Sequence, residues 1–279
     1  MLQGTRSALS MPDELTPEHF ARVAALVRHV AGIDLRPGKE GLVRSRLAGR
    51  MRALAVSSFD EYLDRVERDA SGAELVQMLD VITTNKTSFF REAEHFRFLQ
   101  DEILPALGRR PGGLRIWSAG CSSGEEPYTT AIVLRESLPE PQFAAARILA
   151  TDLSTRVLAR AREATYPEEL LSDVPPHLVR RHFVTVPGGE RLVRVADATR
   201  AGVRFARLNL MSSWPMQGPF DLILCRNVMI YFDKATQERL VDRFAALLAP
   251  GGHLFVGHSE SLTGLQHGLQ YVQPAVYRK

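Results

Sequence analysis

The sequence has only two cysteines, Cys121 and Cys225, in 279 residues, too few for a disulfide framework. No pair of histidines or cysteines has metal-ligand spacing, so we expect no metal. No apolar run approaches the roughly 20 residues of a membrane span, and the N-terminus lacks the basic-then-apolar order of a secretion signal. These absences argue against secreted disulfide scaffolds and membrane-inserted proteins, and we expect a cytoplasmic protein.

The composition is that of a globular chain, with 45% hydrophobic and 24% charged residues. The net charge is only +3, but it is unevenly distributed. Basic residues dominate one short stretch: Arg36, Lys39, Arg44, Arg46, Arg50 and Arg52. Acids dominate residues 60–80, so the basicity forms one local stripe.

Residues 1 to about 90 are predicted to form an all-helical domain. A Thr-Pro pair at residues 16–17 is a typical helix start. A second helix over about 38–54 carries its apolar residues on one face, which turns its arginines toward solvent or a partner. Capping boxes at residues 58–61 and 71–74 indicate two further helices.

A connecting helix is expected over residues 91–110, and the pattern then changes to alternating strands and helices over residues 111–279. Such alternation predicts an α/β fold with a mostly parallel, doubly wound sheet covered by helices on both faces. The expected strands are 114–119, 147–151, 203–208, 221–225 and 253–256.

One region, about residues 166–200, interrupts this alternation. Two short β-rich runs, His182–Val186 and Arg191–Val195, flank a Pro-Gly-Gly-Glu sequence with hairpin spacing, which predicts a small antiparallel insertion. The C-terminal segment Gln270–Arg278 is predicted to be a final strand, antiparallel to the strand at 253–256.

The run LRIWSAGCSSGEEP over residues 114–127 has the pattern of a nucleotide-binding loop: a buried strand, glycines at 120 and 124, and then a helix. Two carboxylates, Glu125 and Glu126, occupy the first helical turn, where they would repel a phosphate. A nucleoside with an ammonium group and no phosphate would fit, and S-adenosylmethionine is the common cofactor of that description.

In a doubly wound sheet the ligand lies at the carboxyl ends of the strands, where polar residues recur here. They are Glu125, Asp152, Asn209, Arg226, Asn227, Tyr231, His258, Ser259 and Glu260. Asp152 is placed to bind a ribose, and the amide of Asn209 could pair with an adenine edge. Structural alternatives stay open, because the glycine loop could be a plain turn, Asp152 a helix cap, and His258 a structural residue.

These motifs together closely resemble the chemotaxis receptor methyltransferases, the CheR family, from about residue 16 to the C-terminus. The strongest signature is TTNKTSFFRE at 83–92, followed in order by WSAGCSSGEEPY, ATDLS, LNL, FDLILCRNVMIYFD and LFVGHSES. The resemblance implies a helical domain joined to a class I, Rossmann-like methyltransferase domain with a small antiparallel β-subdomain. It also implies methylation of glutamate side chains on bacterial chemoreceptors, with S-adenosylmethionine as donor and S-adenosylhomocysteine as product.

The resemblance implies a set of cofactor-binding residues: Asn85, Thr87, Arg91, Glu125, Asp152, Asn209, Leu210, Arg226 and Asn227. Within this set Arg91 suits the cofactor carboxylate, because a guanidinium holds a carboxylate through two parallel hydrogen bonds. Glu125 would take the amino group and Asp152 the ribose. We expect a monomer associated with chemoreceptor arrays, and a receptor C-terminal peptide is an expected ligand of the β-subdomain.

A glutamate has a pKa of about 4.3, so it is already an anionic nucleophile at neutral pH and in-line displacement needs no general base. Tyr231 or Asn227 is expected to orient the substrate carboxylate as a weak donor. Docking of an acidic receptor helix is expected at the basic stripe, through Arg44, Arg46, Arg50 and Arg52.

Two alternatives remain: methylation of nucleic acid through the same stripe, and a cofactor-binding scaffold without turnover. No aromatic platform interleaves with the arginines, which disfavours nucleic acid.

Overall fold

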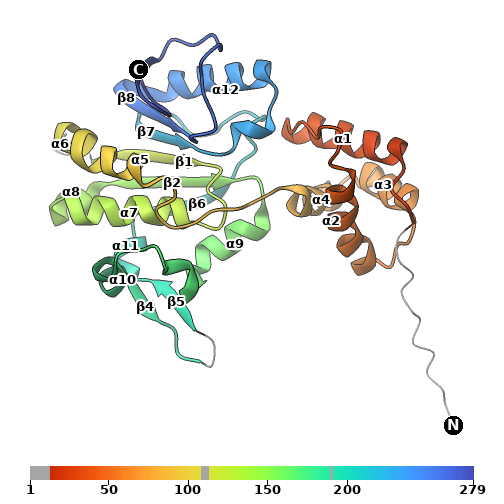
Figure 1. Cartoon of the computed structure of the whole chain (residues 1–279), viewed down its shortest axis with the longest axis horizontal. Coiled ribbons are helices and arrows are strands. Elements are labelled where there is room, and N and C mark those ends of the chain that lie inside the picture. The colour runs from red at the N-terminus through yellow and green to blue at the C-terminus, as the bar shows by residue number, and fades with distance from the viewer. Residues whose placement is uncertain (1–12, 108–112, 189–190) are drawn as a thin grey trace. The chain divides into compact units, whose positions relative to one another are not determined.

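The computed structural model of the chain describes residues 13–107, 113–188 and 191–279, which form two compact units (Figure 1). The smaller unit ends at Thr84 and the larger begins at Asn85. Residues 85–90, which the sequence analysis assigned to the helical domain, therefore belong to the larger unit. The reason is packing, because Phe89 is buried in the hydrophobic core of that unit.

The smaller unit consists of four helices: α1 (Pro17–Ala31), α2 (Glu40–Ala53), α3 (Phe59–Arg68) and α4 (Ala73–Ile82). As predicted, Thr16 caps α1, since its hydroxyl accepts a hydrogen bond from the backbone N–H of His19. The capping box expected at residues 71–74 is absent. The carboxylate of Asp69 accepts the N–H of Glu74 at 2.8 Å instead, because Gly72 adopts the cap position.

The helix expected over residues 91–110 begins only at Ala93. It consists of α5 (Ala93–Phe98), the π-helical turn η1 (Leu99–Ile103) and α6 (Leu104–Leu107), and residues 108–110 lie outside the described part of the chain. Phe90 and Glu92 have left-handed backbones, with φ of 54° and 56°, which no α-helix accommodates. Residues 85–92 are therefore a non-helical segment that ends in a turn, called the strap below.

The larger unit is built on a seven-stranded sheet in the order β6-β2-β1-β7-β8-β10-β9. The five strands from β6 to β8 are parallel, as predicted, and their bounds are β1 (Arg115–Ala119), β2 (Arg147–Asp152), β6 (Val203–Arg207), β7 (Phe220–Cys225) and β8 (Leu248–Val256). The C-terminal segment does pair antiparallel with β8. It is a hairpin of β9 (Gln270–Gln273) and β10 (Val276–Arg278), because Ala275 turns the chain with a φ of 63°.

Helices cover both faces of this sheet, as the alternation predicted: α7 (Glu125–Ser137), α8 (Glu140–Ala145), α9 (Thr155–Glu163) and α12 (Lys234–Leu247). Ile116 of β1 packs in one core cluster with Ile132 of α7. The next residue, Trp117, points to the opposite face, where its ring lies 5.3 Å from that of Phe244 in α12. The strand order reverses between β1 and β7, so the carboxyl ends of these two strands mark the expected binding crevice.

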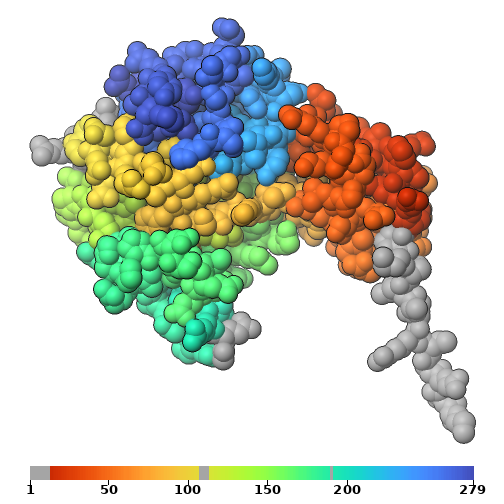
Figure 2. Space-filling view, in the orientation of Figure 1, coloured from red at the N-terminus to blue at the C-terminus, as the bar shows by residue number. Residues whose placement is uncertain are grey.

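The predicted insertion is a three-stranded antiparallel sheet in the order β3-β5-β4, which projects from the larger unit in Figure 2 (green). Its elements are β3 (Thr165–Pro167), η2 (Glu168–Leu171), α10 (Pro176–His182), β4 (Phe183–Thr185), β5 (Leu192–Val195) and α11 (Asp197–Arg200). Gly189 and Glu190 of the expected hairpin turn lie outside the described residues. His182 ties this subdomain to α7 through a 2.8 Å contact between its Nε2 and Oε1 of Glu136.

Candidate functional site

The loop after β1 is fixed to the end of the neighbouring strand. The N–H groups of Gly120 and Cys121 both donate to the carbonyl of Thr151, at 2.8 and 2.9 Å. Gly120 has a φ of 87°, and a Cβ there would lie 2.3 Å from Val228. The glycine therefore permits a close approach of the segment after β7, which brings the ends of β1, β2 and β7 together.

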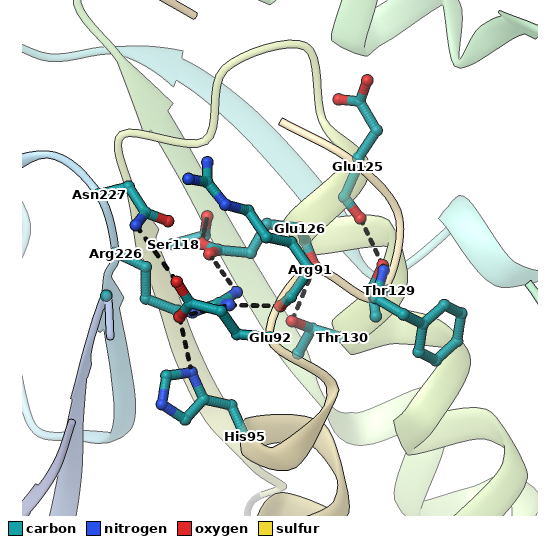
Figure 3. Close-up of polar contacts among 12 residues, drawn as sticks. Arg91, Glu92, His95, Ser118, Glu125, Glu126, Thr129, Thr130, Arg226 and Asn227 are labelled. Atoms are coloured by element: carbon teal, nitrogen blue, oxygen red, sulfur yellow. Dashed lines mark hydrogen bonds and ion pairs between the residues drawn. The ribbon is translucent and has the colours of Figure 1, made fainter. Parts of the chain in front are cut away.

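Glu125 is a buried carboxylate at the start of α7, only 3% exposed. Its two oxygens accept hydrogen bonds from the Ser123 hydroxyl, at 3.0 and 2.8 Å, and burial raises its pKa. Within the described residues it forms no ion pair, and Figure 3 shows its carboxylate pointing away from the neighbouring charged cluster. Such a carboxylate suits the ammonium group of a ligand and would repel a phosphate.

Glu126, expected beside Glu125 at the ligand, has a different role. One of its oxygens accepts the Ser118 hydroxyl at 2.7 Å, and the other pairs with Nη1 of Arg226 at 3.0 Å. Successive residues of a helix point in directions about 100° apart, so the two carboxylates cannot share one environment. One acid of the first turn, and not two, is thus available to a ligand.

Asp152, the last residue of β2, holds two loops at once. Its Oδ2 accepts the N–H of Ser122 at 2.8 Å, and its Oδ1 accepts the N–H of Ser154 at 2.9 Å. Ser154 is the N-cap of α9, and Asp152 holds this cap residue through its backbone N–H. The ribose contact that the resemblance implies for Asp152 stays a prediction.

Asn209 and Leu210 lie in the loop after β6, next to β2 in the sheet. The side-chain oxygen of Asn209 accepts the N–H of Met211 at 2.9 Å, which closes a local turn. The carbonyl of Leu210 accepts bonds from Arg243 of α12 at 2.6 Å and from Trp214 at 3.2 Å. The loop expected at the adenine is therefore held in place from α12.

The strap before α5 runs beside the glycine loop and α7. The carbonyl of Asn85 accepts the Ser122 hydroxyl at 3.0 Å, and the N–H of Phe90 donates to the Thr129 hydroxyl at 3.1 Å. Arg91 donates from Nη1 to the carbonyl of Lys86 at 2.8 Å. Asn85 and Arg91 are thereby brought to the strand ends, and Thr87 lies half-buried between them. Asn85 and Thr87 have no periodic pattern, so only the family resemblance pointed to them.

Arg226, which follows β7, is almost completely buried, with 1% of its side chain exposed. Its guanidinium donates to Glu126 at 3.0 Å, to Glu92 at 3.1 Å and to the carbonyl of Arg91. Figure 3 shows this cluster joining the strap, α7 and β7. These contacts make Arg226 a structural tie between the strap, α7 and β7, and the cofactor contact that the resemblance implies for it stays a prediction.

Asn227 is held by two carboxylates. Its side-chain Nδ2 donates to Glu92 at 3.3 Å, and its backbone N–H donates to Glu260 at 2.6 Å. Glu260 also accepts the N–H groups of Gly257 at 2.6 Å and Ile230 at 3.0 Å. This carboxylate after β8 therefore shapes the segment that leads to Tyr231, which is half-buried on the short helix η3 (Met229–Tyr231).

Glu92, His95 and His258 form a cluster whose potential metal-ligand atoms all lie within 4.8 Å of one another. His95 is buried, and burial first, followed by the charge of Arg226, lowers its pKa to about 4. The Arg226 guanidinium lies 3.1 Å from the Glu92 oxygen that a cation would need, so it disfavours a metal here. Sequence spacing alone did not reveal this cluster, although Glu92 and His95 are separated by three residues at a helix start.

The arginines of α2 in the smaller unit fall into two groups. Arg44 and Arg52 are exposed, as expected of a docking surface. Arg46 donates to the Thr84 hydroxyl at 3.0 Å, and Arg50 binds both oxygens of Glu74 at 2.8 and 2.5 Å. The expected four-arginine surface thus includes two side chains that are used inside the unit.

No helix among the described residues is both long and apolar enough to cross a membrane.

The chain matches two family models in succession. Residues 18–83 match the all-alpha domain of the CheR methyltransferases, and residues 85–277 match their SAM-binding domain. It is 38% identical over 272 residues to a chemotaxis protein methyltransferase of Borreliella burgdorferi, covering 95% of each chain. It is 40% identical over 265 residues to the Escherichia coli protein of the same name, covering 94% of this chain and 91% of the relative. A solved S-adenosylmethionine-dependent methyltransferase of Mesorhizobium loti aligns over 59% of this chain and 52% of its own, with 22% identity and a TM-score of 0.33. By the two domain matches and these relatives, the chain belongs to the CheR methyltransferase family.

Proposed function

We propose that this protein transfers the methyl group of S-adenosylmethionine to glutamate side chains of bacterial chemoreceptors, forming glutamyl methyl esters. Membership of the family supports the general activity, because the chain is a methyltransferase of chemotaxis that uses S-adenosylmethionine. The observation that supports the cofactor within this chain is Glu125, a buried carboxylate without an ion-pair partner among the described residues. Its donor-poor surroundings fit a ligand that brings an ammonium group.

The residues assigned to the cofactor follow from their places at the strand ends. Glu125 takes the amino group, Asp152 the ribose hydroxyls, and Arg91 the carboxylate through a bidentate contact. Asn209 and Leu210 line the adenine, and Asn85 and Thr87 close the site from the strap. S-adenosylmethionine supplies a sulfonium methyl group as the electrophile.

The substrate glutamate is ionised at neutral pH, so the protein supplies position and not a base. Tyr231 is proposed to orient the substrate carboxylate through one hydroxyl donor. A firm guanidinium clamp would stabilise the anion that must react, and the burial of Arg226 among its own carboxylates agrees with that requirement.

The proposed macromolecular partner is the acidic helical domain of a chemoreceptor, which places the protein at receptor arrays in the cytoplasm. The exposed Arg44 and Arg52 supply the complementary charge. A receptor C-terminal peptide is proposed to add to β4, an edge strand of the subdomain sheet on which Val184 is exposed.

The decisive experiment incubates the protein with methyl-tritiated S-adenosylmethionine and receptor cytoplasmic fragments, and then treats the labelled receptor with base. An ester releases the label as methanol, so volatile counts are expected. Receptor fragments whose glutamates are replaced by alanine serve as the control and should remain unlabelled. Label that resists base would indicate methylated nitrogen, and label transferred to added DNA would revive a nucleic-acid substrate.

A further inference from the structure

The side chain of Asn227 is confined on the side that faces Glu92 and Gly257. Its Nδ2 donates to Oε1 of Glu92 at 3.3 Å. A Cβ on Gly257 would lie only 2.4 Å from that nitrogen, so the carboxamide packs directly on the glycine backbone. The backbone N–H of Asn227 is bound to Glu260, and its φ is 60°. Both the backbone and the side chain of Asn227 are thus held.

The negative charge of Glu92 determines whether the nitrogen or the oxygen of the Asn227 carboxamide faces it. Glu92 also accepts Nη2 of Arg226 at 3.1 Å and the N–H of His258 at 3.2 Å. Burial alone would raise the pKa of Glu92, but Arg226 and these hydrogen bonds outweigh it and lower the pKa. An ionised carboxylate can only accept hydrogen bonds, so it binds the nitrogen of Asn227 and would repel the oxygen. Figure 3 shows the amide nitrogen of Asn227 joined to Glu92, with the amide oxygen on the other arm of the carboxamide.

We propose that Glu92 is a positioning residue for methyl transfer, which holds Asn227 with its carboxamide oxygen toward the sulfonium end of S-adenosylmethionine. This inference rests on the proposed function. An amide oxygen attracts the electropositive sulfonium and its methyl hydrogens, whereas the neutral thioether of S-adenosylhomocysteine offers no such charge. The same oxygen would repel a substrate carboxylate, which leaves Tyr231 as the donor to the substrate.

The test measures, by calorimetry, the dissociation constants of S-adenosylmethionine and S-adenosylhomocysteine for the full-length protein and its variants. In Glu92→Gln the new amide can donate to the oxygen of Asn227, so the carboxamide is free to turn over. We expect the affinity for the sulfonium compound to fall about tenfold relative to that for the thioether. Glu94→Gln, the same change at an exposed glutamate two residues on, is the matched control and should leave the ratio unchanged.

A double-mutant cycle separates positioning from general damage. If Glu92 acts through Asn227, then Asn227→Ala lowers the ratio by a similar factor, and Glu92→Gln adds nothing in that background.

An unchanged ratio in Glu92→Gln would overturn the proposal, as would an equal effect of Glu92→Gln with and without Asn227. Loss of both ligands together with a lower melting temperature would assign Glu92 a structural role only. Should Glu92→Gln not fold, an unchanged ratio in Asn227→Ala alone would overturn the proposal. Failure of the wild-type protein to bind either ligand would instead overturn the proposed function.

Discussion

The site contains three glutamates with little solvent exposure, and each has a different set of hydrogen-bond or ion-pair partners. Glu126 pairs with Arg226, Glu260 accepts three backbone N–H groups, and Glu125 accepts the Ser123 hydroxyl and forms no ion pair among the described residues. Burial raises the pKa of both Glu125 and Glu260, yet the backbone bonds of Glu260 stabilise its charged form. The negative charge of Glu125 therefore costs folding free energy, while the proposed cofactor contact requires that same charge.

Glu125→Gln is expected to stabilise the free protein at neutral pH and to weaken cofactor binding at least about tenfold. A folded-state pKa raised above the unfolded value means that ionised Glu125 costs folding free energy, and glutamine removes that cost. The gain, a rise in melting temperature of about 1–4 °C, should vanish as the pH falls through the raised pKa, where Glu125 is itself neutral. Calorimetric unfolding and ligand titration measure both effects.

The matched control for this prediction is Glu126→Gln, which leaves Arg226 with one fewer counter-charge. It should lower the melting temperature, the opposite sign. A melting temperature of Glu125→Gln below that of the wild type, or unchanged binding, would contradict the prediction.

Among the elements, α2 shows how one helix divides similar side chains between two roles. Its buried face places Val43, Leu47 and Met51 in the core of the smaller unit. Arg50 lies close enough to this face to reach Glu74, whose carboxylate also accepts the hydroxyl of Tyr62 at 3.2 Å. Of the four arginines expected to dock the receptor, Arg44 and Arg52 remain exposed, so these two are the ones available for docking.

Reversing the charges of Arg44 and Arg52 to glutamate is expected to weaken binding to receptor cytoplasmic fragments about tenfold, with a smaller effect at high salt. Affinity for S-adenosylmethionine should stay within about twofold, because the change is confined to the smaller unit. Surface plasmon resonance against immobilised receptor fragments measures the first and calorimetry the second.

Arg50→Glu provides the contrast, because it places two carboxylates together in a buried position. It should destabilise the smaller unit instead of acting on the receptor alone. Equal weakening of receptor and cofactor binding by the Arg44 and Arg52 reversals would contradict a docking role.

On the scale of the whole molecule, the larger unit contains two buried histidines, His95 and His182, and a half-buried one, His253, that resist protonation. Burial lowers the pKa of His95 and His253 to about 4, and it also lowers the pKa of His182. Nδ1 of His253 has no hydrogen-bond partner among the described residues. Because the unfolded chain binds these protons near its ordinary pKa of about 6.5, folding stability is lost as the pH falls from there toward 4.

Protonation of these histidines is therefore expected to lower the melting temperature of the full chain as the pH falls from 6.5 to 4, against an opposite contribution from Glu125 and Glu260. His253→Leu should reduce the destabilisation at pH 4 relative to pH 6.5. The substitution removes one proton-binding difference between the folded and unfolded states, together with a buried nitrogen that lacks a partner. Scanning fluorimetry across this pH range measures the slope. His177→Leu, the same change at an exposed position, is the control, and an unchanged slope in His253→Leu would refute the explanation.

Local sequence determined the elements of this protein: the four N-terminal helices, the alternation that builds the parallel sheet, and the antiparallel insertion. These follow from side-chain periodicity, caps and turns, which act over a few residues. The sequence pattern also placed Glu125, Asp152 and Asn227 after the ends of strands, since topology brings those ends together.

Tertiary structure decided which charged side chains remain available to a ligand or partner. Arg226 pairs with Glu126 and Glu92, and Arg50 with Glu74, across separations of 24 to 134 residues, and no local pattern encodes such pairs. A buried charge is stable only beside its counter-charge, so the fold, and not the motif, sets the partner of each side chain.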